Sequence, residues 1–222
     1  MTELTFTVED VVPEPYAAAP ILLARIRVGS TGEDPVHALA LRAQIRIEPQ
    51  RRRYDEAEER ALLGLFGDRS RFAQTLRPFA WLHASTVAPG FTGSTVIDLP
   101  LPCTYDFDVA GTTYLHALRD GAIPLLFLFS GTVFTRGTGG FSVAAVPWDR
   151  EARYALPVAV WRGLMESHFP GTEWVRLGRD AVDALAHFRH VRGLTSWDDA
   201  VTVLLAESGA AVPPGAREGA GA

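Results

Sequence analysis

Residues 123–134 read IPLLFLFSGTVF, and this stretch decides the fold. After Pro124 both alternating sets of side chains are apolar, with Leu125, Phe127, Phe129 and Val133 on one face and Leu126, Leu128 and Phe134 on the other. A strand that is apolar on both faces is covered on both faces. We therefore expect a central strand with a second sheet on one side and helices on the other.

The rest of the chain supplies strands for two sheets. We predict about eight, at residues 4–8, 19–28, 39–48, 79–87, 95–101, 103–109, 123–134 and 141–146, separated by turn signals. Pro100 and Pro102 lack the N–H that a central strand needs, so their strand belongs at a sheet edge or at a bulge. This spacing is typical of an antiparallel sandwich.

Helical spacing appears in one insertion and again after Trp148. Residues 55–66 predict a helix between two strands, ended by Gly67. Three more helices are expected near residues 157–168, 179–191 and 196–207, and Ser196 with Asp199 forms a capping-box signature at the start of the last one. In the second of them, Ala181, Val182, Leu185 and Phe188 are expected to face inward.

The predicted fold is α+β: an antiparallel β-sandwich with one inserted helix and a C-terminal layer of about three helices packed on one sheet. We expect a single domain over residues 1–208, β-rich at 4–150 and helical at 156–207. Residues 209–222 are rich in small residues, proline and glycine, and are expected to be a disordered tail.

Composition excludes several classes of protein. The 222 residues are 47% hydrophobic with a net charge of -5, as in an ordinary globular protein. Cys103 is the single cysteine, so no internal disulfide and no multi-cysteine metal site arises from this chain alone. The basic triplet Arg51 to Arg53 is interpreted as a solvated strand end, which argues against nucleic-acid binding. No signal peptide and no run of about 18 apolar residues is present, which predicts a cytoplasmic protein without membrane insertion.

Three polar groups of residues are candidate sites. Asp183, His187 and His190 lie at i, i+4 and i+7 of a helix, a spacing that can present ligands to zinc or nickel, or simply a solvated face. The acidic pair Asp106 and Asp108 shares one face of a predicted strand, where an exposed acidic face is favoured over a calcium site.

His168 lies in an apolar helical stripe. It either donates to a backbone carbonyl or faces a ligand pocket lined by Trp148 and Trp161. Cys103 is interpreted as an inert buried thiol. No nucleophile elbow, phosphate loop, dinucleotide fingerprint or HExxH motif occurs, so we assign no catalytic residue and no cofactor.

Four stretches resemble a family of actinobacterial proteins of unknown function whose genes often lie near those of nickel-iron hydrogenases: TYDFDV at 104–109, GAIPLLFLFSGTVF at 121–134, VPWDREARY at 146–154 and VAVWRGLMESHFPGTEWVRL at 158–177. This resemblance implies a cytoplasmic accessory protein whose partner is a hydrogenase subunit or a maturation factor. A metal-binding protein, a small-ligand module or an enzyme of unknown reaction are the alternatives.

Overall fold

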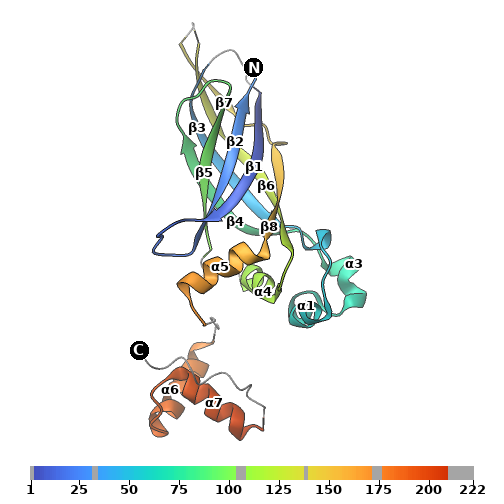
Figure 1. Ribbon diagram of the computed structural model, residues 1–222, viewed down its shortest axis with the longest axis vertical. Coiled ribbons are helices and arrows are strands. Elements are labelled where there is room, and N and C mark those ends of the chain that lie inside the picture. The colour runs from blue at the N-terminus through green and yellow to red at the C-terminus, as the bar shows by residue number, and fades with distance from the viewer. Residues whose placement is uncertain (1–2, 32–34, 104–108, 138–139, 172–176, 210–222) are drawn as a thin grey trace. The chain divides into compact units, whose positions relative to one another are not determined.

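The computed structural model describes residues 3–31, 35–103, 109–137, 140–171 and 177–209. Contacts divide the chain into two compact units, residues 1–170 and 171–222. The first unit holds all eight strands that the described residues form, and the second holds the last two helices (Figure 1).

The strands form two antiparallel sheets. The three-stranded sheet has the order β1 (Leu4–Pro13), β2 (Ile21–Ser30), β5 (Ser94–Pro102). The five-stranded sheet contains β4 (Phe79–Ala88), β3 (Val36–Ile47) and β6 (Ala122–Gly137), followed by β7 (Gly140–Ala145) and β8 (Glu151–Pro157), which pair with the two ends of β6. Pro100 and Pro102 lie in β5 at an edge, as predicted.

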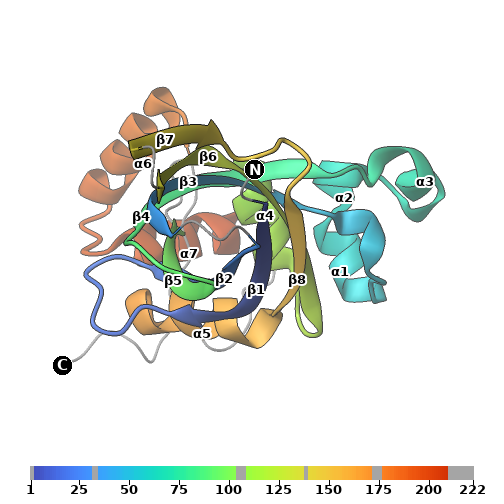
Figure 2. The ribbon, with the colours of Figure 1, turned by 90° about the horizontal axis from the view of Figure 1, so that it is seen from above.

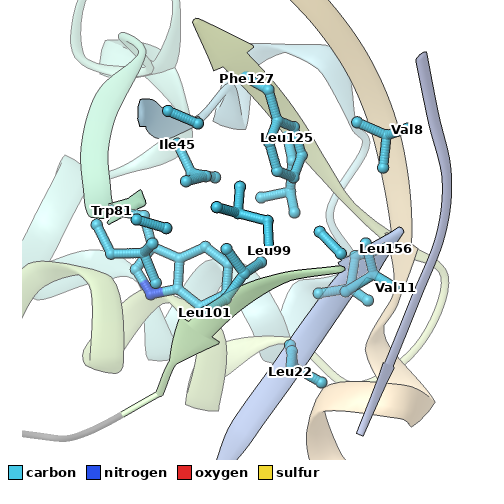
Figure 3. Close-up of a cluster of buried hydrophobic side chains, with 14 of the residues drawn as sticks. Val8, Val11, Leu22, Ile45, Trp81, Leu99, Leu101, Leu125, Phe127 and Leu156 are labelled. Atoms are coloured by element: carbon cyan, nitrogen blue, oxygen red, sulfur yellow. The ribbon is translucent and has the colours of Figure 1, made fainter. Parts of the chain in front are cut away.

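The two sheets pack face to face and nearly close on each other. β5 lies against β4 and β1 lies against β8, so the sandwich has the outline of a flattened barrel (Figure 2). Its interior is filled by apolar side chains from both sheets, among them Ile45, Leu99 and Phe127 (Figure 3). The rings of Phe6 and Phe129 stack across the sheets with centroids 4.6 Å apart. The barrel interior is therefore a packed core.

The central strand is β6, as residues 123–134 predicted. It pairs with β3 on one side and with β7 and β8 on the other. Its inward set, including Leu125 and Phe127, is buried, but on the outer face Leu128 and Phe134 are only half-buried and Ser130 is exposed. Leu126, also on the outer face, is buried, so the expectation that both faces of this strand are covered holds for the inner face and only in part for the outer one.

The inserted helix is present but broken. α1 (Glu56–Ala61) and α2 (Leu63–Phe66) meet at the buried Leu62, and a 3-10 turn (η2, Arg69–Arg71) and α3 (Phe72–Thr75) complete the insertion before β4. A 3-10 turn at Pro49–Arg51 (η1) precedes it. Asp55 and Glu58 form a capping box at the start of α1.

Two segments near the central strand differ from the sequence prediction. Residues 103–109 were expected to form a strand, but β5 ends at Pro102 and Val109 begins helix α4 (Val109–Ala117); residues 104–108, with Asp106 and Asp108, lie outside the described part. Strand β8 was not predicted, although Ala152, Tyr154 and Leu156 alternate with the polar Glu151 and Arg153 and pack on the core.

Helix α5 (Val158–His168) follows β8 directly and packs against β1 and β8. Its apolar stripe, with Trp161, Leu164 and Met165, is buried in the core cluster. In Figure 1, α4 and α5 lie together at one end of the strands. They cover that end of the core, which confirms the sequence interpretation of this stripe.

The second unit is a helical pair. α6 (Arg179–Val191) and α7 (Trp197–Glu207) are joined by an Arg192–Glu207 ion pair of 2.7 Å, and the Arg189 guanidinium lies 4.1 Å from the Trp197 ring centroid. The Ser196–Asp199 capping box is confirmed. No side chain of α6 is buried: of the residues predicted to face inward, Ala181 and Val182 are exposed, and Leu185 and Phe188 are half-buried.

The α+β class is confirmed, with two antiparallel sheets packed together, a short inserted helix and three C-terminal helices. The single domain over residues 1–208 stays a prediction. The predicted tail at 209–222 lies outside the described residues from 210 onward.

Candidate functional site

The outer face of the five-stranded sheet carries a shallow depression of about 730 Å³. Its floor comes from the middle of β3, β4 and β6, and one wall is Trp148 from the β7–β8 connection. The lining residues are Arg42, Ala43, Gln44, His83, Ala84, Ser85, Leu128, Phe129, Ser130 and Trp148. Polar and apolar groups therefore meet in one hollow of this sheet.

Strand alternation explains why these side chains face outward. In β3, Leu41, Ala43 and Ile45 are buried in the core, so Arg42 and Gln44 point to the opposite face. The pairing register then places Ser85 of β4 and Ser130 of β6 beside Arg42. His83 and Leu128 lie beside Gln44 in the same way. The floor thus consists of two cross-strand rows.

Trp148 is exposed because the chain bulges between β7 and β8. The backbone is held to β6 on both sides of this bulge, since Val146 donates its N–H to Gly131 O and Phe129 donates to Arg150 O, both at 2.9 Å. The residues between these anchors cannot pair with β6, and the indole of Trp148 is left 92% exposed. A large apolar ring therefore lies exposed at the rim of the depression.

One hydrogen bond orders the polar floor. The side-chain amide of Gln44 lies 3.1 Å from Nε2 of His83. With the Gln44 nitrogen as donor, Nε2 is the acceptor and the ring proton is on Nδ1. The His83 imidazole is therefore oriented by Gln44, and neither Ser85 nor Ser130 is hydrogen-bonded to it in the described structure.

Arg42 differs from the other arginines of this face. Arg46 donates to Pro78 O, and Arg153 pairs with both Glu48 and Glu151. Arg42 forms no ion pair and no side-chain hydrogen bond with any part of the chain that the structure describes. Its guanidinium is available to a bound group.

Of the three residues predicted to line a ligand pocket, the depression contains Trp148 alone. Trp161 is buried on α5, where its ring meets the His116 ring at 4.8 Å. His168 lies between two backbone carbonyls, with Nδ1 3.0 Å from Leu164 O and Nε2 3.1 Å from Ala17 O. This arrangement matches the first interpretation of His168, a histidine bonded to the backbone.

The predicted metal ligands Asp183, His187 and His190 are all exposed on α6. Across the described residues, no three His, Cys, Asp or Glu side chains are grouped so that they could hold a metal ion. The metal site stays a prediction.

Of the basic triplet at residues 51–53, Arg51 and Arg53 are exposed, but the interpretation as a solvated segment was wrong for Arg52. The Arg52 side chain is 9% exposed and donates to both carboxylate oxygens of Glu58, at 2.7 and 2.8 Å, while Glu58 is 2% exposed. Glu58 also accepts from the backbone N–H of Arg119 at 2.8 Å. This ion pair joins the insertion to the segment before β6 and has a structural role.

Cys103 lies in the core, as predicted, 7% exposed and with Sγ 3.4 Å from Leu101 O. Burial raises the pKa of its thiol to about 12. A thiol with this pKa stays protonated at neutral pH and is a poor nucleophile.

Sequence reasoning placed Arg42, Gln44 and His83 in strands but did not connect them. The available signal was the alternation of residues 39–48, which marks Arg42 and Gln44 as outward. The register that brings His83 and Ser130 beside them requires the strand order β4-β3-β6, which alternation does not contain.

Among the described residues, no helix is long and apolar enough to cross a membrane. Comparison with curated proteins and with solved structures finds no significant match to this chain. The sequence profile of DUF6084, a family of unknown function, matches residues 1–213, and the chain therefore belongs to this family.

Proposed function

We propose that this chain is a non-catalytic accessory protein that binds another protein in the cytoplasm, through the outer face of its five-stranded sheet. The observation that carries the proposal is Trp148, an indole 92% exposed at the rim of a depression. Tryptophan and arginine are the residues most enriched among those that dominate binding energy at protein interfaces. Both are present here, as Trp148 and Arg42.

The surroundings of Trp148 support a docking role. Leu128 is half-buried in the floor beside it, so a partner side chain would gain apolar contact on two sides. The polar groups around this apolar centre resemble the rim of an interface. Exposed indole is costly in water, and its burial by a partner returns about 25 cal/mol for each Å² covered.

The hydrogen bonds of the depression favour binding over catalysis. A hydroxyl nucleophile needs a base within hydrogen-bond reach. His83 is engaged by Gln44, and the described hydroxyls of Ser85 and Ser130 have no such base. These groups are arranged as donors for recognition.

The resemblance described above supports a specific class of partner, a nickel-iron hydrogenase subunit or maturation factor. Within this proposal, the depression is the surface that a subunit would contact.

The test is affinity purification of the tagged full-length chain from its own host at native expression, followed by quantitative mass spectrometry. Trp148→Ala is compared with wild type and with Tyr16→Ala. Tyr16 is the matched control, because its ring is fully exposed in the β1–β2 connection and does not line the depression. Neither substitution removes a core contact, so both proteins are expected to fold with stability changes within about 0.5 kcal/mol.

We expect a set of proteins that wild type and Tyr16→Ala recover and Trp148→Ala loses. Hydrogenase subunits or maturation factors in that set support the specific partner class, and a set without them removes that class while leaving the docking role. If the three proteins recover the same partners, the docking role of Trp148 is wrong.

A second candidate is a small-ligand module, favoured by one observation. The volume of about 730 Å³ is within the range of ligand pockets. Thermal-shift screening of wild type against Trp148→Ala tests it: a compound that stabilises only wild type, at concentrations near its Kd, supports this alternative.

A further inference from the structure

We propose that the partner inserts an acidic segment into the depression, with a carboxylate on Arg42 and a neighbouring apolar side chain against Trp148 and Leu128. This inference rests on the proposed docking function and adds the chemistry of what is bound. It commits to an extended protein segment in place of a free small anion.

The charge of the side chains that line the depression favours an anionic group. The depression is lined by one arginine, one histidine and no acidic residue, although the whole chain has a net charge of -5. The two carboxylates that follow Trp148 in the sequence each lie near an arginine: Asp149 lies 3.7 Å from Arg150, and Glu151 lies 2.7 Å from Arg153. Arg42 is left as an uncompensated cation in a locally basic hollow, which favours an anionic group.

Arg42 lies in a cross-strand row of hydrogen-bond donors. In the pairing register, Arg42 is opposite Ser85 on β4 and opposite Ser130 on β6, so the three form one row across the sheet. Neighbouring strands are about 4.8 Å apart, so the Arg42 position has a serine on each side. All three side chains are exposed and supply hydrogen-bond donors. A carboxylate can accept two bonds from the guanidinium fork and a third from a serine.

A second row of side chains lies next to the donor row and supplies an apolar contact. Gln44 is opposite His83 and Leu128, one pleat repeat from the donor row. Two residues of a strand span about 7 Å, the same distance that separates alternate side chains of an extended peptide. A segment with an acidic and an apolar residue two positions apart can therefore place one over Arg42 and the other over Leu128 and Trp148. A free anion uses only the first row.

The experiment uses the full-length chain and three labelled peptides of equal length. In each peptide a leucine and a second residue stand two positions apart with serine between them, so that both share one face of the extended chain. The second residue is glutamate, glutamine or lysine. Fluorescence anisotropy at low salt gives the Kd of each. We expect the glutamate peptide to bind about 10-fold more tightly than the glutamine peptide, and the lysine peptide to bind more weakly still. Raising the salt should remove most of this preference, because the Arg42 site is open to solvent.

Charge reversal gives the decisive comparison. Arg42→Glu is expected to reverse the order, so that the lysine peptide binds more tightly than the glutamate peptide. Arg162→Glu is the control, since it changes the net charge equally from an exposed position on α5 that does not line the depression. It should keep the wild-type order. Trp148→Ala should weaken all three peptides without changing their order.

Equal binding of the glutamate and glutamine peptides, no binding of the glutamate peptide, or an unchanged order in Arg42→Glu overturns the inference. Competition by sodium glutamate alone at the peptide's own Kd also overturns it, because the bound species is then a small anion. None of these results touches the capture experiment with Trp148→Ala, so a failure of the acidic segment is distinguished from a failure of the docking function.

Discussion

The buried ion pair between Arg52 and Glu58 gives the sharpest prediction on stability. Arg52 belongs to a triplet of arginines, but its side chain is buried, whereas the side chain of its neighbour Arg51 is 54% exposed. In Arg52→Ala the Glu58 carboxylate stays buried with the backbone N–H groups of Arg119 at 2.8 Å and Asp55 at 3.4 Å as donors. Three further guanidinium bonds, to the carbonyls of Arg53, Asp120 and Ala122, are also lost.

Removing one partner of a buried ion pair costs about 3–5 kcal/mol, because a charge is left without compensation. The remaining N–H donors place Arg52→Ala near the lower end, about 3 kcal/mol. For a protein of this size that corresponds to a fall in Tm of roughly 10 °C. Arg51→Ala is the control: its contact with Glu48 is 3.6 Å long and exposed at the arginine, so it should cost under about 1 kcal/mol.

The assay is urea unfolding followed by tryptophan fluorescence, which reports on the first unit through the buried Trp81 and Trp161. Arg52→Ala with Glu58→Gln should be less destabilised than Arg52→Ala alone, because no carboxylate is stranded. A cost below about 1 kcal/mol for Arg52→Ala, or no difference from Arg51→Ala, would refute the assignment of this pair as a structural link.

Three further outcomes are expected. Gly131 in β6 has φ 147°, and a Cβ there would collide with Ala40 O, so Gly131→Ala should lower the free energy of urea unfolding by about 3 kcal/mol or more. Gly163→Ala on α5 is the control, because a Cβ at that position has open space and should not destabilise the protein. The Cys103 thiol, whose pKa burial raises to about 12, should resist DTNB at pH 8 in the native protein and react once per chain in urea; fast native reaction would contradict this. Burial raises the pKa of Tyr54 to about 12 and also raises that of Tyr114, so the folded state holds both phenols neutral. The contribution of the neutral phenols to the free energy of unfolding is complete below about pH 10 and is lost as the pH rises toward 12. Urea unfolding at a series of pH values should show this loss, and Tyr54→Phe should make the fall in unfolding free energy with pH less steep.

Much of the fold was predictable because local pattern and tertiary role agree in it. Residues 123–134 predicted a central strand, and β6 is central because it pairs with β3 on one side and with β7 and β8 on the other. Pro100 and Pro102 fixed an edge strand by their missing N–H groups. Ser196 and Asp199 fixed a helix start through local hydrogen bonds. Each of these signals acts within a few residues.

The errors come from positions where partners distant in sequence decide. Val109 continued an apolar alternation and was predicted to lie in a strand, but it begins α4. Arg52 looked like part of a solvated run, and only the fold around Glu58 shows why it is buried. The half-covered outer face of β6 was predicted to be buried because Leu128 and Phe134 are apolar, although apolar residues can equally form an exposed binding surface.

The candidate site was predictable only in part. Trp148 was singled out, but together with Trp161 and His168, which lie on α5 and not in the depression. Arg42 and Ser130 are far apart in sequence, and pairing register alone makes them neighbours. A site built from cross-strand rows is invisible until the strand order is known.

The docking role of the depression is tested most directly by site-specific photo-crosslinking in the host cell. Trp148→benzoylphenylalanine places the reactive group at the rim, and Tyr16→benzoylphenylalanine places it at an equally exposed position outside the depression. We predict that illumination joins the chain to a second protein from position 148 and not from position 16, and that Arg42→Glu weakens this adduct. Adducts of equal yield from both positions, or none from position 148, would contradict the claim that this face binds a protein.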